Sequence, residues 1–125
     1  MKPNELEIAV LRSFLADREQ HPAAFPASLD SLKVTDRALT GAGFLTEFER
    51  SRELKWFQDG VSMRWGNVGA RLNTPKLETG YLVYVDDGYV TAVEGYTYGD
   101  PWPERVDSIE VYELKPGMKL ATTLG

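Results

Sequence analysis

Large aromatic rings lie beside carboxylates in segment 93–104, which reads VEGYTYGDPWPE. Tyrosine and tryptophan rings next to acidic side chains suit contact with sugar rings, with cations or with the hot-spot side chains of a protein partner. We therefore expect a binding site formed by Glu94, Tyr96, Tyr98, Asp100, Trp102 and Glu104. The competing interpretation is structural. Tyr96 and Tyr98 alternate with Thr97 as in any strand, and Trp102 between two prolines would cover the open end of a sheet.

Glu47 and Glu94 offer a second chemistry. Both follow apolar neighbours in strand-like runs, where burial would favour the protonated form of a carboxyl group. Two carboxyl groups about 5 to 10 Å apart across a cleft can hydrolyse a glycosidic bond. However, alternation places Glu47 opposite Phe44 and Phe48, so solvent exposure explains Glu47 equally well. The alternative to a partner surface is thus a small-molecule or carbohydrate site, with hydrolysis as one form of it, that uses Glu47 and Glu94 with aromatic walls.

Other catalytic and metal chemistries find little support. The chain has no cysteine, which excludes disulfides and thiolate catalysis. Its only histidine, His21, precedes Pro22 and has no nucleophile or acid nearby in the sequence. Asp86 and Asp87 lack the ligand spacing of a calcium loop, and turn formation suffices to explain them. We assign no catalytic residue and no metal ligand.

Gly41 and Gly43 precede an aromatic run and superficially resemble a phosphate-binding loop. The Lys-Ser/Thr pair of one such loop and the third glycine and following helix of another are missing. A tight turn or bulge at the start of a strand explains both glycines. We therefore expect no nucleotide and no other cofactor.

The charge balance limits the partners. Fourteen basic against nineteen acidic residues leave a net charge of −5, which argues against nucleic acid. An acidic surface suits a basic protein, as in inhibitors or immunity proteins that mask a cationic nuclease or toxin. The arginines Arg37, Arg64 and Arg71 would either clamp an anionic ligand or pair with the excess acids. No apolar run approaches the roughly 20 residues that span a bilayer, and we see no signal peptide, so we expect a cytoplasmic protein without membrane contact.

Periodicity predicts one helix and then strands. Asn4 and Glu7 have the spacing of a capping box, and apolar residues recur at helical intervals to about Gln20, before His21-Pro22. From residue 31 the period becomes two, with Asp86-Asp87-Gly88 as a hairpin turn. The predicted strands follow Ser31, cover residues 44–48, 63–72, 81–85 and 89–93, and end with 108–114. We expect a single α+β domain over 1–125, in which the N-terminal helix packs on a curved, mostly antiparallel sheet of five to seven strands.

Three segments carry a likeness to other proteins: RALTGAGFLTEF at 37–48, GYLVYVDDG at 80–88 and VEGYTYGDPWPE at 93–104. Together they resemble a family of small uncharacterised bacterial proteins, over most of the chain from Val34 to Leu114. Val93 stands where that family usually has leucine. The resemblance implies a bacterial origin and one fold-sized unit, and it implies no activity.

The leading hypothesis is a non-enzymatic binding or interaction protein, because no catalytic set assembles in the sequence while segment 93–104 combines aromatic and acidic side chains. A basic protein partner or a second copy of the chain would occupy that surface.

Overall fold

The structure is a computed structural model of the chain, and it describes residues 1–15 and 29–113. One helix, α1 (Glu5–Leu15), precedes the strands β1 (Val34–Leu39), β2 (Gly43–Phe48), β3 (Met63–Leu72), β4 (Leu77–Asp86), β5 (Tyr89–Thr97) and β6 (Ile109–Glu113). Two 3-10 turns, η1 (Leu29–Ser31) and η2 (Arg52–Leu54), precede β1 and β3. The predicted strands are confirmed. The predicted end of the helix near Gln20 and His21 lies outside the described residues.

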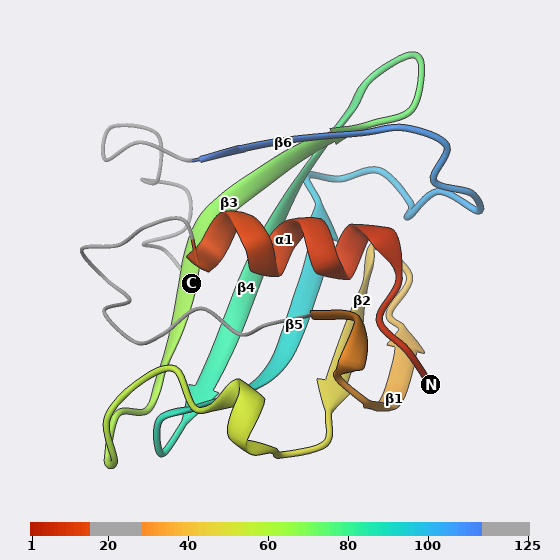
Figure 1. Cartoon of the computed structure of the whole chain (residues 1–125). Coiled ribbons are helices and arrows are strands. Elements are labelled where there is room, and N and C mark those ends of the chain that lie inside the picture. The colour runs from red at the N-terminus through yellow and green to blue at the C-terminus, as the bar shows by residue number, and fades with distance from the viewer. Residues whose placement is uncertain (16–28, 114–125) are drawn as a thin grey trace.

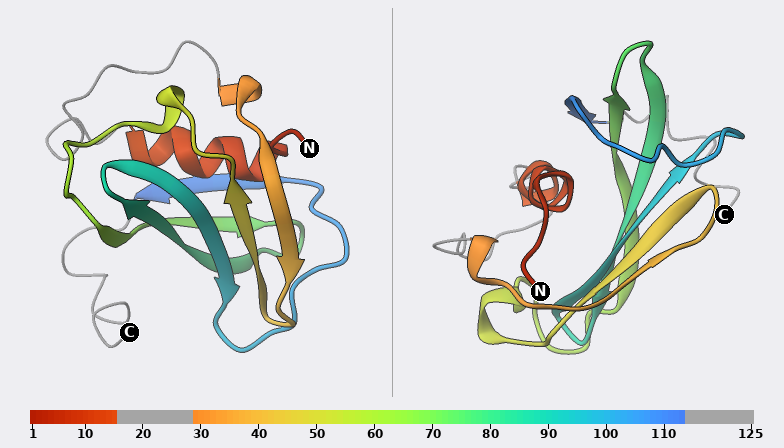
Figure 2. Two further views of the ribbon diagram at one scale, coloured as in Figure 1. Left: turned by 90° about the horizontal axis from the view of Figure 1, so that it is seen from below. Right: turned by 90° about the vertical axis from the view of Figure 1, so that its right-hand side faces the viewer.

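The strands form one open sheet in the order β1-β2-β5-β4-β3-β6, and every neighbouring pair is antiparallel. This confirms an α+β architecture with one helix and an antiparallel sheet. Helix α1 lies across one side of the sheet (Figure 1), where it contacts β3, β4 and β6. Figure 2 shows the helix on that side from two further directions. We call the side under α1 the inner face and the opposite side the outer face.

The core lies between α1 and the inner face. Val10, Leu11 and Phe14 recur at helical spacing and are fully buried. Tyr81 and Val83, two residues apart on β4, are also fully buried. Burying such side chains stabilises the fold by about 1.5 to 3 kcal/mol each. Residues 80, 82 and 84 consequently point to the outer face, because successive side chains of a strand alternate.

The start of α1 is held by the predicted capping box. The side chain of Asn4 accepts a hydrogen bond from the backbone N–H of Glu7 at 2.8 Å. The Glu7 carboxylate in turn accepts one from the backbone N–H of Asn4 at 2.8 Å. These two reciprocal hydrogen bonds fix the N-terminus of α1 and hold its first turn beside β1 and β2.

Two hairpin turns also follow the sequence prediction. Between β4 and β5 only Asp87 and Gly88 lie outside the ladder, and both have positive φ, 50° and 83°. Two such residues match the right-handed twist of the strands that they join. Between β1 and β2, Gly41 has φ of 85°, and the Thr40 N–H donates to the Gly43 carbonyl at 2.9 Å. Gly41 therefore forms the turn, and Gly43 is the first residue of the strand that follows it.

Candidate functional site

The fold divides segment 93–104 between two sides of the sheet. Tyr96 pairs across the ladder with Gly80, whose neighbours on β4 place it on the outer face. Trp102 follows the end of β5, and its backbone N–H donates a hydrogen bond to the Gly41 carbonyl at 3.0 Å. Its ring meets that of Phe44, a buried inner-face residue, edge to face at 5.1 Å. The predicted binding residues thus form two separate groups.

On the outer face, two tyrosine rings lie over two glycines. The ladder aligns Tyr96, Gly80, Gly69 and Tyr112 in one row across β5, β4, β3 and β6. A β-carbon on Gly80 would lie 2.7 Å from ring atoms of Tyr96 and from the Tyr98 hydroxyl. One on Gly69 would lie 2.7 Å from the ring of Tyr112. Glycine at both positions is what lets these rings lie close to the sheet.

Tyr96 and Tyr98 form an edge-to-face pair, with centroids 5.6 Å apart and planes at 85°. Tyr98 is 52% exposed, which places it among the large hydrophobic side chains most open to solvent. Burial raises the pKa of Tyr96 to about 12, and the nearby Tyr98 and Glu94 add to that shift. Tyr96 is therefore neutral at ordinary pH. Its ring is half-buried, and the ring of Tyr98 is presented to solvent.

Acidic side chains hold two other outer-face tyrosines. The Tyr84 hydroxyl donates a hydrogen bond to Glu94 at 2.5 Å. Burial is the main cause of the raised pKa of Tyr84, and this hydrogen bond is the second cause. The Tyr112 hydroxyl donates to Glu78 at 2.6 Å. Burial, as the larger cause, and the hydrogen bond to Glu78 together raise the pKa of Tyr112 to about 12. Glu94 is thus tied to a phenol and stays partly exposed beside Tyr96.

Cations of the chain itself lie over several tyrosine rings. Arg71 is 4.6 Å from the centroid of Tyr112, and Arg64 is 6.0 Å from that of Tyr84. Arg71 also forms an ion pair with Glu78 at 2.7 Å, so the acid that neutralises this arginine belongs to the same chain. Tyr89 is covered likewise, by Arg50 at 4.7 Å and Lys55 at 5.4 Å. Within residues 1–15 and 29–113, no cation lies over Tyr96 or Tyr98.

The remaining predicted acids are exposed. Glu47 lies on the outer face opposite Ala92, and Glu94 lies opposite Leu45 two positions along. Such diagonal neighbours on adjacent strands are about 7 Å apart. Asp100 and Glu104 are exposed in the connection from β5 to β6. The part of the chain that the structure describes contains no ion pair to either and no cluster of potential metal ligands.

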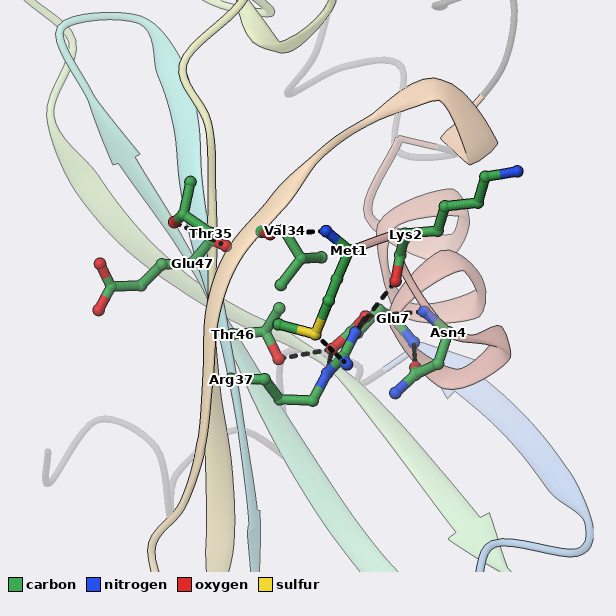
Figure 3. A network of polar contacts seen from close by, with 9 residues as sticks. All are labelled: Met1, Lys2, Asn4, Glu7, Val34, Thr35, Arg37, Thr46 and Glu47. Carbon is green, nitrogen blue, oxygen red and sulfur yellow. Dashed lines mark hydrogen bonds and ion pairs between the residues drawn. The ribbon is translucent and has the colours of Figure 1, made fainter.

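The inner face holds a buried ionic network in which Arg37 pairs with an acid, one of the two roles expected for it, although the sequence did not identify Glu7 as the partner. The Glu7 side chain is fully buried and forms a two-pronged ion pair with Arg37 of β1, with both N–O distances at 2.7 Å. The Thr46 hydroxyl of β2 donates to the same carboxylate at 2.5 Å. With the Asn4 N–H, each oxygen of Glu7 accepts two hydrogen bonds (Figure 3). The hydrogen bonds to Glu7 raise the pKa of Arg37.

Beside this network a pocket of about 510 Å³ opens between the start of α1, the β1–β2 hairpin and the β5–β6 connection. Six apolar residues line it: Leu6, Leu39, Phe44, Trp102, Val106 and Ile109. Its polar lining consists of Asn4, Glu5 and Arg37. Leu39 is 77% exposed and Val106 is 36% exposed. Neither Glu47 nor Glu94 lines this pocket.

The fold and these surfaces define the class: an α+β protein in which one helix covers one face of an open antiparallel sheet. Searches of protein-family profiles, curated proteins and solved structures found no match to this chain. In the described residues, no helix has the length and apolar character needed to cross a membrane.

Proposed function

We propose that this chain is a non-enzymatic binding protein of the bacterial cytoplasm that engages a basic protein partner through Tyr96 and Tyr98. In its most specific form the proposal is an inhibitor- or immunity-like role, in which the acidic chain masks a cationic nuclease or toxin. The observation that carries the proposal is that no cation among residues 1–15 and 29–113 covers these two rings, whereas Tyr84, Tyr89 and Tyr112 each have one.

The chemistry of the open rings supports this partner. An arginine or lysine over a tyrosine face is attracted by the ring quadrupole, by about 0.5 to 2 kcal/mol depending on desolvation. Glu94 lies two residues from Tyr96 on the same side of β5, and Glu47 lies diagonally beyond it. A partner's guanidinium over Tyr96 or Tyr98 would therefore meet carboxylates at its edge, as Arg71 meets Glu78 when it lies over Tyr112.

The long-range field acts in the same direction. With a net charge of −5, the chain attracts a basic protein and repels other acidic ones. Asp100 follows Tyr98 by two residues, and both Asp100 and Glu104 are exposed in the β5–β6 connection, where they add to the acidic charge of the chain. Charges of this kind accelerate association and select the partner more than they add affinity.

The test is affinity capture from a bacterial lysate with immobilised wild-type protein and with a Tyr96→Ala/Tyr98→Ala variant. Tyr89→Ala is the matched control, since Arg50 and Lys55 already occupy that ring. We expect wild type and Tyr89→Ala to retain the same basic proteins and the double variant to lose them, with circular dichroism unchanged. The proposal fails if the double variant retains every captured protein, or if the captured proteins are acidic.

A carbohydrate or other small-molecule site at Glu47 and Glu94 is the second candidate, favoured by their diagonal placement on one face. A glycan array separates the two functions, because a carbohydrate site would give glycan binding that Glu94→Gln abolishes, whereas a surface for a basic protein gives no glycan binding. Self-association is a further use of the same surface. Light scattering detects it as a doubled mass that Tyr98→Ala returns to the monomer.

A further inference from the structure

We propose that the inner-face pocket binds a neutral, mainly apolar small molecule that carries a hydrogen-bond acceptor, such as an aromatic ketone or amide. This site lies on the other side of the sheet from Tyr96 and Tyr98, so the proposal stands independently of the partner surface.

The dimensions and walls of the pocket suit a small organic ligand. Its volume of about 510 Å³ falls within the range of about 300 to 1,000 Å³ typical of small-molecule sites. The walls come from one helix and three strands, with Leu6 on α1, Leu39 on β1, Phe44 on β2 and Ile109 on β6. The edge-to-face contact between Phe44 and Trp102 gives the pocket an aromatic wall that the fold itself orients.

Two apolar side chains at the rim of the pocket are exposed to solvent. Leu39 follows Arg37 by two residues on β1 and is 77% exposed, the largest fraction among the exposed large hydrophobics of the described chain. Val106 lies in the β5–β6 connection and is 36% exposed. A ligand that fills the pocket would remove apolar surface of both residues from water, which is the main source of affinity for such a ligand.

The charges around the pocket select against an ionic ligand. Arg37 lines the pocket, but its charge is cancelled by the buried carboxylate of Glu7. The remaining charge on the lining belongs to Glu5, which repels an anion. A cation would lose its hydration on entering walls that are mostly apolar. That desolvation free energy is larger than the attraction to one exposed carboxylate. A neutral ligand avoids both costs.

Several hydrogen-bond donors on the lining have no acceptor among residues 1–15 and 29–113. Nε of Arg37 donates to Glu7, and Nη2 donates to Glu7 and to the Lys2 carbonyl. Nη1 contacts only the Met1 sulfur, at 3.5 Å. The side-chain amide N–H groups of Asn4 and the indole N–H of Trp102 have no acceptor among the described residues. The pocket therefore offers neutral or neutralised donors, and an uncharged carbonyl or ether oxygen is the complementary group.

The test uses three naphthalenes with the same 6-dimethylamino ring system. The first carries a 2-acetyl group, and the others carry a 2-carboxylate or a 2-trimethylammonium group. We expect the ketone to bind saturably at one site with a blue-shifted emission, and to bind at least about tenfold more tightly than either ion, as the desolvation of a charged group predicts. Methyl NMR should show shifts at Leu39, Val106 and Ile109.

Variants locate the site. Leu39→Ser should weaken ketone binding about fivefold, the effect of losing part of one buried leucine. Met63→Ser is the matched control, since Met63 is also an exposed apolar residue at a strand end, is 38% exposed and does not line the pocket. Both positions are exposed, so the fold tolerates both changes. The proposal is overturned if the ketone does not bind, if an ion binds equally well, or if the two variants behave alike.

Discussion

A β-carbon built on Gly43 of β2 would lie 1.9 Å from the carbonyl oxygen of Gly95 on β5, so these two strands meet at a distance that only glycine allows. The ring of Phe44 covers Gly95 in turn, since a β-carbon there would lie 2.3 Å from its Cε2 atom. The close contact places Phe44 over the inner face, where it forms the wall of the pocket with Trp102.

Gly43→Ala is therefore expected to lower the free energy of unfolding by about 3 kcal/mol, the upper end of the usual cost of overpacking, because the obstacle is backbone that cannot rotate away. Gly41→Ala is the control. It adds only the strain of a positive φ, about 1 kcal/mol, since nothing lies within 4 Å of its β-carbon. Urea unfolding measures both. Equal losses would contradict the close approach of β2 and β5.

Glu7 and Arg37 are expected to be strongly coupled. Glu7→Gln leaves the Arg37 guanidinium without its counter-charge next to a fully buried site, so we expect a loss of about 3 kcal/mol. Arg37→Met likewise leaves the buried Glu7 carboxylate without its counter-charge. The Glu7→Gln/Arg37→Met variant removes both charges and should lose less stability than the sum of the two single losses.

Urea unfolding of the four proteins gives the coupling energy of this cycle. A double variant that loses the sum of the two single losses would show that the pair contributes nothing beyond its separate contacts. Thr46→Val supplies an internal check, because it removes one hydrogen bond to Glu7 and keeps the charges, and its loss should be smaller, near 1 kcal/mol.

The strands and hairpins were predictable because their signals are local. The alternation over 81–85 separates buried from partly exposed positions, and Asp87-Gly88 supplies the two positive φ values that a short hairpin requires. The capping box of Asn4 and Glu7 is likewise encoded within four residues. Each of these patterns is decided by neighbours in sequence, so each can be identified without the tertiary structure.

The candidate site was only partly predictable because its arrangement depends on distant contacts. Alternation correctly joins Tyr96 to Glu94 on one face of β5. The separation of Trp102 from them depends on its hydrogen bond to Gly41, sixty-one residues earlier in the chain. The pairing of Glu7 with Arg37 is similarly non-local, at a separation of 30 residues. Local spacing had given Glu7 a complete role in the helix cap, so nothing in the sequence required a second one.

Alkaline pH should destabilise the fold through the outer-face tyrosines. In the folded chain the pKa of Tyr112 is raised to about 12 from the ordinary 10, mainly by burial. The contribution of the neutral phenol is therefore complete below pH 10 and is lost as the pH rises from 10 toward 12. Tyr112→Phe, which cannot ionise, should lose less stability than wild type over that interval.

Urea unfolding across this alkaline interval tests the expectation, and Tyr96→Phe should behave in the same direction because burial also raises the pKa of Tyr96 to about 12. Parallel pH profiles for wild type and both variants would contradict it. They would mean that the two phenols ionise as easily in the folded chain as in the unfolded chain.

Gly80→Ala should displace the tyrosine pair while leaving the fold intact. The new β-carbon would lie 2.7 Å from the outer end of the Tyr96 ring and from the Tyr98 hydroxyl. Side chains on an open face can rotate outward, so we expect a loss of about 1 kcal/mol, the lower end of the cost of overpacking. Because burial is the largest cause of the raised pKa of Tyr96, the displaced ring should titrate closer to 10.

NMR of tyrosine labelled at the ring carbon that bears the hydroxyl resolves Tyr96 from the other tyrosines. Gly41→Ala, which lies in the β1–β2 turn with no atom near its β-carbon, should leave the titration of Tyr96 unchanged. If Gly80→Ala also leaves it unchanged, the ring does not lie over Gly80 as the structure has it. If the pKa falls and capture of basic partners falls with it, the position of the two rings against the sheet matters for binding as well as their presence.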